Sequence, residues 1–411
     1  MIIQGMNYII PLITVPYLIA TLGATGYGYI GFSLAYVGYF GLIVEFGFGL
    51  SATKRMVYGQ SIGPATAARI FTATVYAKFL LFAIAVIPYF LLPVFIPTIR
   101  QYATAIYCMF PLLVGQTITM GWFFQSIGKI RVIAFLTGLT RILILPLIFI
   151  FVKSPTDYPA AALIQSGVVL AAGIISIGYL IFKRQLVLRY VTLKHVKIEL
   201  SESFPLFLSG VATSIYTQLF TIILGFLSSP AVVGVYSASE RIIRVLCFSI
   251  YTPINQAFFP KLARLAVKSR VEAKRLAHKI LTFLCIVMGF VGIFILLFAP
   301  EISMIIGKGK YDGMTTLLRI MSLAPLIISI GGVFGQSGLV AMGDSRSKKD
   351  FRNTYFIAGL VALILITILA PLFEDVGAAI AMTATEGVVT AMMIFYVKKR
   401  DKQRLSYSKL K

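Results

Sequence analysis

The sequence predicts an all-α protein that crosses a membrane about twelve times. Of its 411 residues, 59% are hydrophobic and only 12% are charged, and the mean hydropathy is +0.92. Such values are typical of polytopic membrane proteins. Apolar runs recur along the whole chain, and no gap between them is long enough for a separate soluble domain. We therefore expect no extramembranous enzyme domain.

The candidate spans follow from length, because one crossing of the hydrocarbon core takes about 20 apolar residues. The first run has no Lys or Arg before Lys54 and no small-residue cleavage site, so it predicts a retained helix, bent at Pro11 and Pro16. We expect spans at 2–22, 28–52, 69–96, 102–124, 132–152, 159–182, 205–228, 232–260, 278–300, 314–341, 353–373 and 376–397.

The basic residues predict the topology. Lys and Arg number 37 against 14 acids, a formal charge of +23, and every second segment between the spans holds nearly all the positive charge outside them. The outward set has only Arg100, Lys153, Lys308 and Lys310. By the positive-inside rule both termini are cytoplasmic, and the charge reflects topology and contact with anionic lipid rather than nucleic-acid binding. The predicted cytoplasmic segments are 53–68, 125–131, 183–204, 261–277, 342–352 and the tail from 398.

Repeated patterns predict two lobes of six helices. Pro111-Leu112-Leu113 precedes Gly128-Lys129-Ile130-Arg131, and Pro325-Leu326-Ile327 precedes Gly343-Asp344-Ser345-Arg346 at nearly the same interval. Six spans separate the copies, so the lobes would share one orientation and be related by a pseudo-twofold axis along the membrane normal. The predicted domains are an N-terminal lobe (1–182), a basic cytoplasmic linker (183–204), a C-terminal lobe (205–397) and a basic cytoplasmic tail (398–411).

The span at 232–260 carries charges near its middle. At about 100° per residue, one face of the helix collects its polar side chains. Charges at this depth normally face a bundle interior or an aqueous cavity. Two interpretations remain. The face lines a cavity that holds an anion, or Glu240 and Arg244 neutralise each other as a structural pair that does not include Arg241. The face comprises Ser237, Glu240, Arg241, Arg244, Tyr251 and Asn255.

The charged residues inside the spans are mostly basic, which favours an anionic substrate over a cationic one. Guanidinium groups match phosphate oxygens bidentately, so a pyrophosphate is the expected ligand. For Lys78 an internal pair or snorkelling is an alternative, and Arg319 could lie near an interface. The predicted pyrophosphate-binding residues are Arg241, Arg244, Arg141, Lys78 and Arg319.

Three acids lie inside the predicted spans, namely Glu45, Glu240 and Glu386. Burial disfavours a charged carboxylate, whereas a nearby arginine favours it. We expect these acids to couple transport to protons or another ion. Glu386, with no Lys or Arg close in sequence, is the strongest candidate, and Glu240 is expected to stay ionised beside its arginines.

The sequence contains no motif for ATP hydrolysis, metal binding or disulfide formation. The GKGK at 307–310 lacks the first glycine and the strand-to-helix context of a phosphate-binding loop, so no ATP hydrolysis is expected. His195 and His278 are isolated, without metal-ligand spacing. The three cysteines lie in apolar spans and indicate neither disulfides nor a metal site. We expect no cofactor.

Several segments resemble the Wzx-type polysaccharide flippases of the multidrug/oligosaccharidyl-lipid/polysaccharide exporter superfamily. The resemblance runs along the whole chain and depends on the order and spacing of the segments rather than on any one of them. They are QGMNYIIPLITVPYLIATLG near the start, GYG at 26–28, EFGFGLSATKR at 45–55, GWFFQSIGKIR at 121–131, VKSPTDY at 152–158 and VVGVYSASERIIR at 232–244.

The resemblance implies a twelve-helix transporter of the bacterial inner membrane. Its substrate would be an undecaprenyl-pyrophosphate-linked oligosaccharide, an O-antigen or capsule repeat unit, moved to the periplasmic leaflet by ion-coupled alternating access. The resemblance places Arg241 at the cavity, and glycan polymerase or chain-length proteins are possible partners. Members of the family usually begin several residues earlier, with a basic amino terminus.

Three other functions fit the sequence less well. A multidrug exporter of the same superfamily would need a mainly acidic cavity for organic cations, which the basic balance disfavours. A peptidoglycan-precursor flippase usually has two further helices. A membrane glycan polymerase or ligase would need a sizeable periplasmic loop with catalytic residues, and the longest outward loop, around 301–313, is too short.

Overall fold

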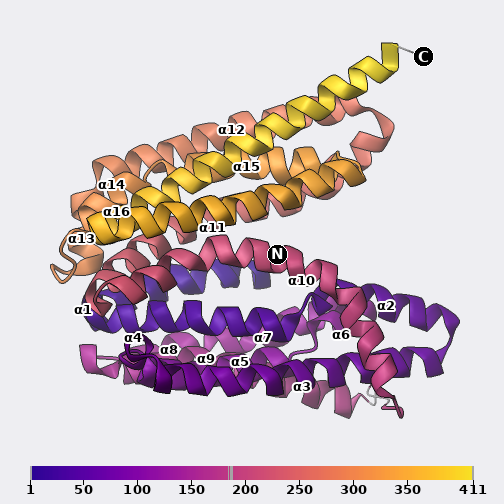
Figure 1. Cartoon of the computed structure of the whole chain (residues 1–411), viewed down its shortest axis with the longest axis horizontal. Helices are drawn as coiled ribbons and strands as arrows, with labels where there is room; N and C mark the ends of the chain where they lie inside the picture. Colours follow the sequence, from indigo (N-terminus) through magenta and orange to yellow (C-terminus); the bar gives the residue numbers. More distant parts are fainter. Residues whose placement is uncertain (1, 184, 186–187, 410–411) are drawn as a thin grey trace. The chain divides into compact units, whose positions relative to one another are not determined.

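The chain folds into helices throughout the part that the structure describes. The computed structural model describes residues 2–183, 185 and 188–409, and it divides into two compact units, Met1–Ser214 (unit 1) and Ile215–Lys411 (unit 2) (Figure 1). Helix α10 (Leu193–Leu227) runs from the first into the second. The other elements of unit 1 are α1 (Ile2–Glu45), α2 (Phe48–Ile62), α3 (Pro64–Phe95), α4 (Pro97–Arg100), α5 (Ala103–Ile118), α6 (Gly121–Ser126), α7 (Ile130–Ile142), α8 (Ile144–Phe151), the 3₁₀-helix η1 (Pro155–Asp157) and α9 (Tyr158–Phe182).

Unit 2 contains six further α-helices and one π-helix. The π-helix η2 follows α15 directly, and α16 is the longest helix, with 65 residues. These elements are α11 (Pro230–Lys268), α12 (Arg270–Leu297), α13 (Ala299–Gly307), α14 (Met314–Met321), α15 (Ala324–Gly332), η2 (Val333–Ala341) and α16 (Ser345–Lys409).

The helices are long and apolar enough to make this a multi-pass membrane protein. Within the described residues, nine helical stretches qualify as spans by length and composition, or ten if the bent α10 counts as one. Two stretches, Ile10–Ile62 and Arg346–Gln403, have 53 and 58 residues. At about 20 residues per crossing each is long enough for two. The twelve-helix arrangement with pseudo-twofold symmetry stays a prediction.

Breaks inside the two longest helices fall between predicted spans. Gly23 interrupts α1 with φ 68° and ψ 179°, between the spans predicted at 2–22 and 28–52. Glu374 interrupts α16 with φ 48° and ψ −122°, between those predicted at 353–373 and 376–397. Glycine adopts positive φ at little cost, whereas glutamate does so under strain.

The structure differs from the sequence prediction in two segments that were expected as loops. Residues 53–68 are helical except at Gly63, which has φ 151°. Residues 261–277 are helical except at Ser269, whose side chain accepts a hydrogen bond from the backbone N–H of Glu272 and caps α12. Lys and Arg are good helix formers, so helices continue beyond the apolar stretch that hydropathy detects.

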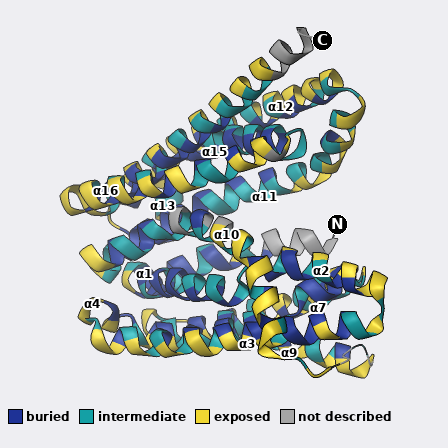
Figure 2. Cartoon of the chain, turned by 45° about the vertical axis from the view of Figure 1, so that its right-hand side comes forward, coloured by how far each residue is buried: buried dark blue, intermediate teal, exposed yellow. Residues whose placement is uncertain are grey.

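Exposed residues lie along the outer helices (Figure 2), and many of them are large and apolar. On α12, Phe283, Ile286, Phe290 and Ile293 recur at helical spacing and are all more than half exposed. The opposite face packs into unit 2 through buried residues such as Leu284. A helix that is apolar on both faces suits a bundle surrounded by lipid.

The first part of α10 packs with unit 1 through polar contacts to α2. The Arg55 guanidinium lies 2.8 Å from the Glu199 carboxylate, and the hydroxyls of Ser51 and Ser203 form a hydrogen bond. The boundary between the two compact units falls after Ser214, within α10, and the predicted domain bounds, with the second lobe beginning at 205, stay a prediction. The predicted linker and tail include residues 184, 186, 187, 410 and 411, which lie outside the described residues.

Helices α5 and α9 approach each other at glycines. A Cβ on Gly115 would lie 2.6 Å from the backbone nitrogen of Leu170, and one on Gly173 would lie 3.0 Å from the carbonyl oxygen of Gly115. Real Cβ atoms do not come so close to backbone atoms. The contact therefore depends on the missing side chains.

We expect Gly115→Ala to destabilise the protein by about 1–3 kcal/mol, because the two backbones must separate. Gly167→Ala is the matched control on α9, since a Cβ there meets no atom within 4 Å, and it should be neutral or slightly stabilising. Thermal unfolding of the purified variants in detergent measures both. Equal unfolding temperatures for the two variants would show that the close approach is not needed.

Candidate functional site

Helix α11 carries the charged stretch that the sequence singled out. It begins with Pro230 at its first position after the cap Ser229, whose hydroxyl accepts a hydrogen bond from the Val232 backbone. Tyr236, Glu240, Cys247 and Tyr251 recur on one face at helical spacing, and each is at most 9% exposed. This face packs into unit 2.

Glu240 and Arg244 form an ion pair on this face. The Arg244 Nε donates to Glu240 Oε1 at 2.8 Å, and the two side chains are 18% and 11% exposed for Arg244 and Glu240 respectively. The pair that the sequence left open as one alternative is therefore present. Each charge offsets part of the desolvation cost of the other, so removing either partner would leave an unpaired buried charge.

Glu386 on α16 lies close to the same face of α11. Glu386 is only 3% exposed. It lies within electrostatic reach of Tyr236 and Cys247 of α11 and of Tyr355 of α16. Tyr236 also interacts with Glu240 and Arg244. Unit 2 thus gathers two carboxylates, one guanidinium and several phenols in its interior.

Sequence reasoning named Tyr251 and Ser237 on the polar face but missed the phenols of Tyr236 and Tyr355. The hydroxyls of Tyr236 and Tyr251 are buried and make no hydrogen bond within the described residues, and the same holds for Ser237. Buried polar groups normally find a partner, so a hydroxyl of this kind is a natural position for water or an ion. The signal was present, since Tyr236 precedes Glu240 by one helical turn.

Arg241 differs from its neighbours because it is exposed. No ion pair of Arg241 is present among the described residues. The predicted polar face is therefore divided: Ser237, Glu240 and Tyr251 are buried, while Arg241 points away from the core of unit 2. Asn255 forms a hydrogen bond with Gln336 and joins α11 to η2.

Lys78 and Glu45 meet in unit 1. Lys78 is 2% exposed, and its ammonium donates to Glu45 Oε2 and to the Gln116 carbonyl, both at 3.1 Å. The Glu45 side chain is 47% exposed. The internal pair that was weighed for Lys78 is present, and the ammonium is enclosed by these two acceptors.

Removing the partner of a buried ammonium is costly. We expect Glu45→Leu to lower the free energy of unfolding by roughly 1–3 kcal/mol. Replacing both residues, in Glu45→Leu with Lys78→Met, should restore most of it because a buried pair exchanges well for apolar groups. Thermal unfolding in detergent measures the stability of both, and a transport assay on the double variant then asks whether the Lys78 charge is itself needed.

The remaining predicted basic residues are exposed. Arg141 lies in the last turn of α7, and Arg319 lies in the last turn of α14, whose other face is buried through Met314, Leu317 and Leu318. Within the described residues no group of three His, Cys, Asp or Glu side chains is arranged to hold a metal ion.

Solved structures share this fold. The lipid II flippase MurJ in an inward closed conformation matches with a TM-score of 0.73 and 15% identity, over 97% of this chain and 87% of that one. An inward-facing multidrug resistance MATE family transporter of the MOP superfamily matches with a TM-score of 0.72 and 17% identity, over 96% and 98%. The fold class of this chain is therefore the one that these two membrane proteins share.

Sequence comparison identifies the family within this class. Two proteins named "Putative O-antigen transporter" are similar: that of Escherichia coli (strain K12) is 36% identical over 97% of this chain and 94% of its own length, and that of Shigella dysenteriae is 28% identical over 97% and 98%. The family model described as polysaccharide biosynthesis protein matches residues 1–266. The chain belongs to this family of Wzx-type flippases, which confirms the resemblance found in its sequence.

Proposed function

We propose that this protein moves an undecaprenyl-pyrophosphate-linked oligosaccharide, an O-antigen or capsule repeat unit, from the cytoplasmic to the periplasmic leaflet of the bacterial inner membrane. Its relatives are named as O-antigen transporters and its structural neighbours as flippases or transporters, not enzymes. Both termini would be cytoplasmic. Glycan polymerase or chain-length proteins would act on the product after translocation.

The observation that carries this proposal is the exposed guanidinium of Arg241 on a membrane-spanning helix. A charge at this depth is unfavourable against lipid, so it must meet water or a charged ligand. A pyrophosphate is the ligand whose oxygens suit a guanidinium fork. Arg141 and Arg319 are exposed as well and would add positive charge along the path of the headgroup.

The other two basic residues contribute less directly. Arg244 is paired with Glu240, so it would add its field rather than a direct contact. Lys78 donates to Glu45 and Gln116, and it would bind phosphate only after exchanging these partners. Because the side chains of Arg241, Arg141 and Arg319 are exposed, we rank these three before Arg244 and Lys78 as pyrophosphate ligands.

Ion coupling would use the buried carboxylates. Glu386 has the lowest exposure of the three candidates and lies beside Tyr236, whose hydroxyl makes no hydrogen bond within the described residues. Glu240 is held by Arg244, and Glu45 by Lys78. An exchangeable proton or cation at Glu386 would change the charge inside unit 2 and favour one conformation of the transporter. Alternating access would follow from this change.

The direct test is flipping in proteoliposomes. Fluorescent undecaprenyl-pyrophosphoryl sugar is incorporated, and dithionite then quenches only the label in the outer leaflet. We expect the purified protein to make the inner pool accessible, and equally labelled phosphatidylcholine should remain protected. If the protein instead expels ethidium and leaves the polyprenyl lipid in place, the function is that of a multidrug exporter.

A further inference from the structure

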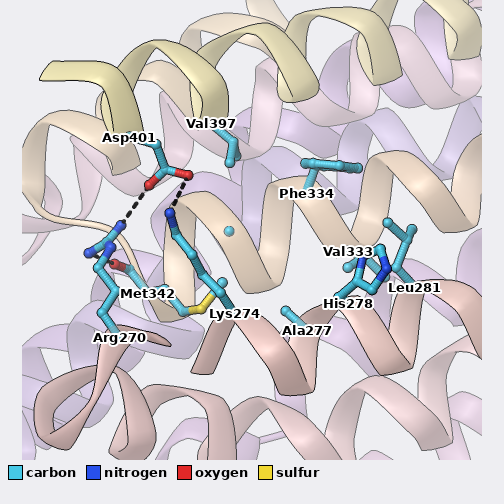
Figure 3. Close-up of a pocket in the computed structure, with 11 residues that line it drawn as sticks. Arg270, Lys274, Ala277, His278, Leu281, Val333, Phe334, Met342, Val397 and Asp401 are labelled. Atoms are coloured by element: carbon cyan, nitrogen blue, oxygen red, sulfur yellow. Dashed lines mark hydrogen bonds and ion pairs between the residues drawn. The ribbon is translucent and has the colours of Figure 1, made fainter. Parts of the chain in front are cut away.

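Unit 2 contains a cavity outside the cluster described above. It has a volume of about 190 Å³ and lies where α12, η2 and the end of α16 meet (Figure 3). None of its lining residues belongs to the candidate transport site. The π-helix η2 supplies Val333 and Phe334, and π-helices are uncommon elements that often occur at functional positions.

One end of the cavity is charged. The Lys274 ammonium lies 2.8 Å from the Asp401 carboxylate, and the Arg270 guanidinium lies 3.5 Å from the same carboxylate. Arg270 also donates to the carbonyl oxygen of Met342 at 3.1 Å. Two cations therefore share one carboxylate, and with His278 neutral the lining has a net charge of +1.

The other end of the cavity is apolar. Arg270, Lys274, His278 and Leu281 follow one another along one face of α12 at spacings of three or four residues. At a rise of about 1.5 Å per residue, this row is about 16 Å long. Figure 3 shows Leu281 and the π-helical Val333 at the end remote from Asp401. A polar head followed by an apolar surface matches an amphiphile.

A second cavity, in unit 1, is of similar size but is lined by uncharged residues only. It lies where α2, α3 and α6 meet and has a similar volume, about 200 Å³. Its lining is neutral throughout, from Met56 and Phe71 to Gln185. In unit 2, by contrast, two cations share a single carboxylate, so the lining keeps one positive charge that an anionic ligand would balance.

The surroundings of the charged end are strongly basic. An ion pair of 2.6 Å between Arg400 and Asp350 joins the last turns of α16 to its first turns, and Asp401 joins them to α12. Basic clusters at the end of membrane helices attract anionic lipid. The exposed cations on these three segments are Arg275, Lys279, Arg346, Lys348, Lys349, Lys398, Lys399 and Lys402.

We propose that this cavity binds one anionic membrane phospholipid of the phosphatidylglycerol type. Arg270 and Lys274 hold its phosphodiester, and Leu281, Val333 and Phe334 contact the start of an acyl chain. The net charge of the lining, +1, matches a single phosphodiester. A lipid-linked pyrophosphate carries more negative charge and a bulky glycan, which a cavity of about 190 Å³ does not accommodate.

Asp401 gives the site a built-in competitor. Its carboxylate occupies the two cations in the absence of lipid, and a phosphate replaces it or shares them. Lys274→Gln should therefore weaken binding, whereas Asp401→Asn should strengthen it. If the ion pairs serve only the structure, both substitutions should change lipid binding in the same direction, because each removes the contact between Lys274 and Asp401.

The test counts lipids retained by the purified full-length protein. The protein is exchanged into nanodiscs of phosphatidylcholine with about 20% phosphatidylglycerol, a fraction that limits non-specific attraction to the membrane surface. Native mass spectrometry then reports the bound phosphatidylglycerol. We expect Lys274→Gln to reduce its affinity about fivefold, the effect of one basic residue at a membrane surface. Asp401→Asn should raise it. Lys279→Gln, an exposed cation on the same helix that does not line the cavity, is the matched control and should change little.

A second measurement locates the lipid. Trp122 is the only tryptophan of the chain, so Phe334→Trp in a Trp122→Phe background places one fluorophore at the cavity. Phosphatidylglycerol brominated near its headgroup should quench it more than brominated phosphatidylcholine. Equal quenching, or equal losses in Lys274→Gln and Lys279→Gln, overturns the proposal. Displacement of phosphatidylglycerol by undecaprenyl phosphate at equal concentration would assign the cavity to the polyprenyl lipid and overturn it as well.

Discussion

Arg241→Gln should abolish most transport while leaving the protein folded in the membrane. The side chain is exposed and has no ion pair among the described residues, so its loss breaks no ion pair of unit 2. A charge-assisted hydrogen bond to phosphate is worth about 1.5–3 kcal/mol. We therefore expect the flipping rate in the dithionite assay to fall by roughly tenfold or more.

Two further variants make this result specific. Arg241→Lys keeps the charge but not the planar fork, so an intermediate rate is expected. Lys268→Gln removes an exposed cation from the last turn of the same helix and serves as the control. Unchanged transport by Arg241→Gln at normal protein levels would remove the main support for pyrophosphate recognition by α11.

Glu386→Gln should uncouple transport from the ion gradient. The amide has nearly the shape of the carboxyl group but neither gains nor loses a proton, and it coordinates cations more weakly. Proteoliposomes with and without an imposed pH gradient are compared, and a sodium gradient is the second arm. The parent should flip faster with one of the gradients, and the variant should flip at the same rate with and without it.

The control for this prediction is Glu301→Gln in the first turn of α13, where the carboxylate is exposed. It should respond to the gradient as the parent does. A full gradient response by Glu386→Gln would exclude this residue from coupling. Glu240 would then be the next candidate, although its pair with Arg244 makes a loss of stability the first expected effect of replacing it.

Much of the fold was predictable because the bilayer imposes a length on each helix. The spans predicted around Gly23 and around Glu374 meet at observed breaks. The helical ends of α2 and α11 were not predictable from hydropathy, because it measures the apolar stretch and not the helix. Basic residues such as Lys54 and Arg264 continue a helix without being apolar.

The candidate site was predictable by residue type but not by arrangement. The pair of Glu240 with Arg244 follows from their spacing of four residues on one helix. The approach of Glu386 to Tyr236 and the enclosure of Lys78 by Glu45 depend on packing between helices far apart in sequence. Periodicity also placed Arg241 with the buried face, although a single step of about 100° is enough to turn it outward.

The glycine contact between α5 and α9 limits how unit 1 can deform. A Cβ on Gly115 would meet the main chain of Val169 and Leu170, so no rotamer change can loosen this contact, and we expect α5 and α9 to move together. Bending of unit 1 during a transport cycle is then left to the described positions where the backbone already has positive φ, at Gly23, Phe46, Gly47, Gly63 and Gly128.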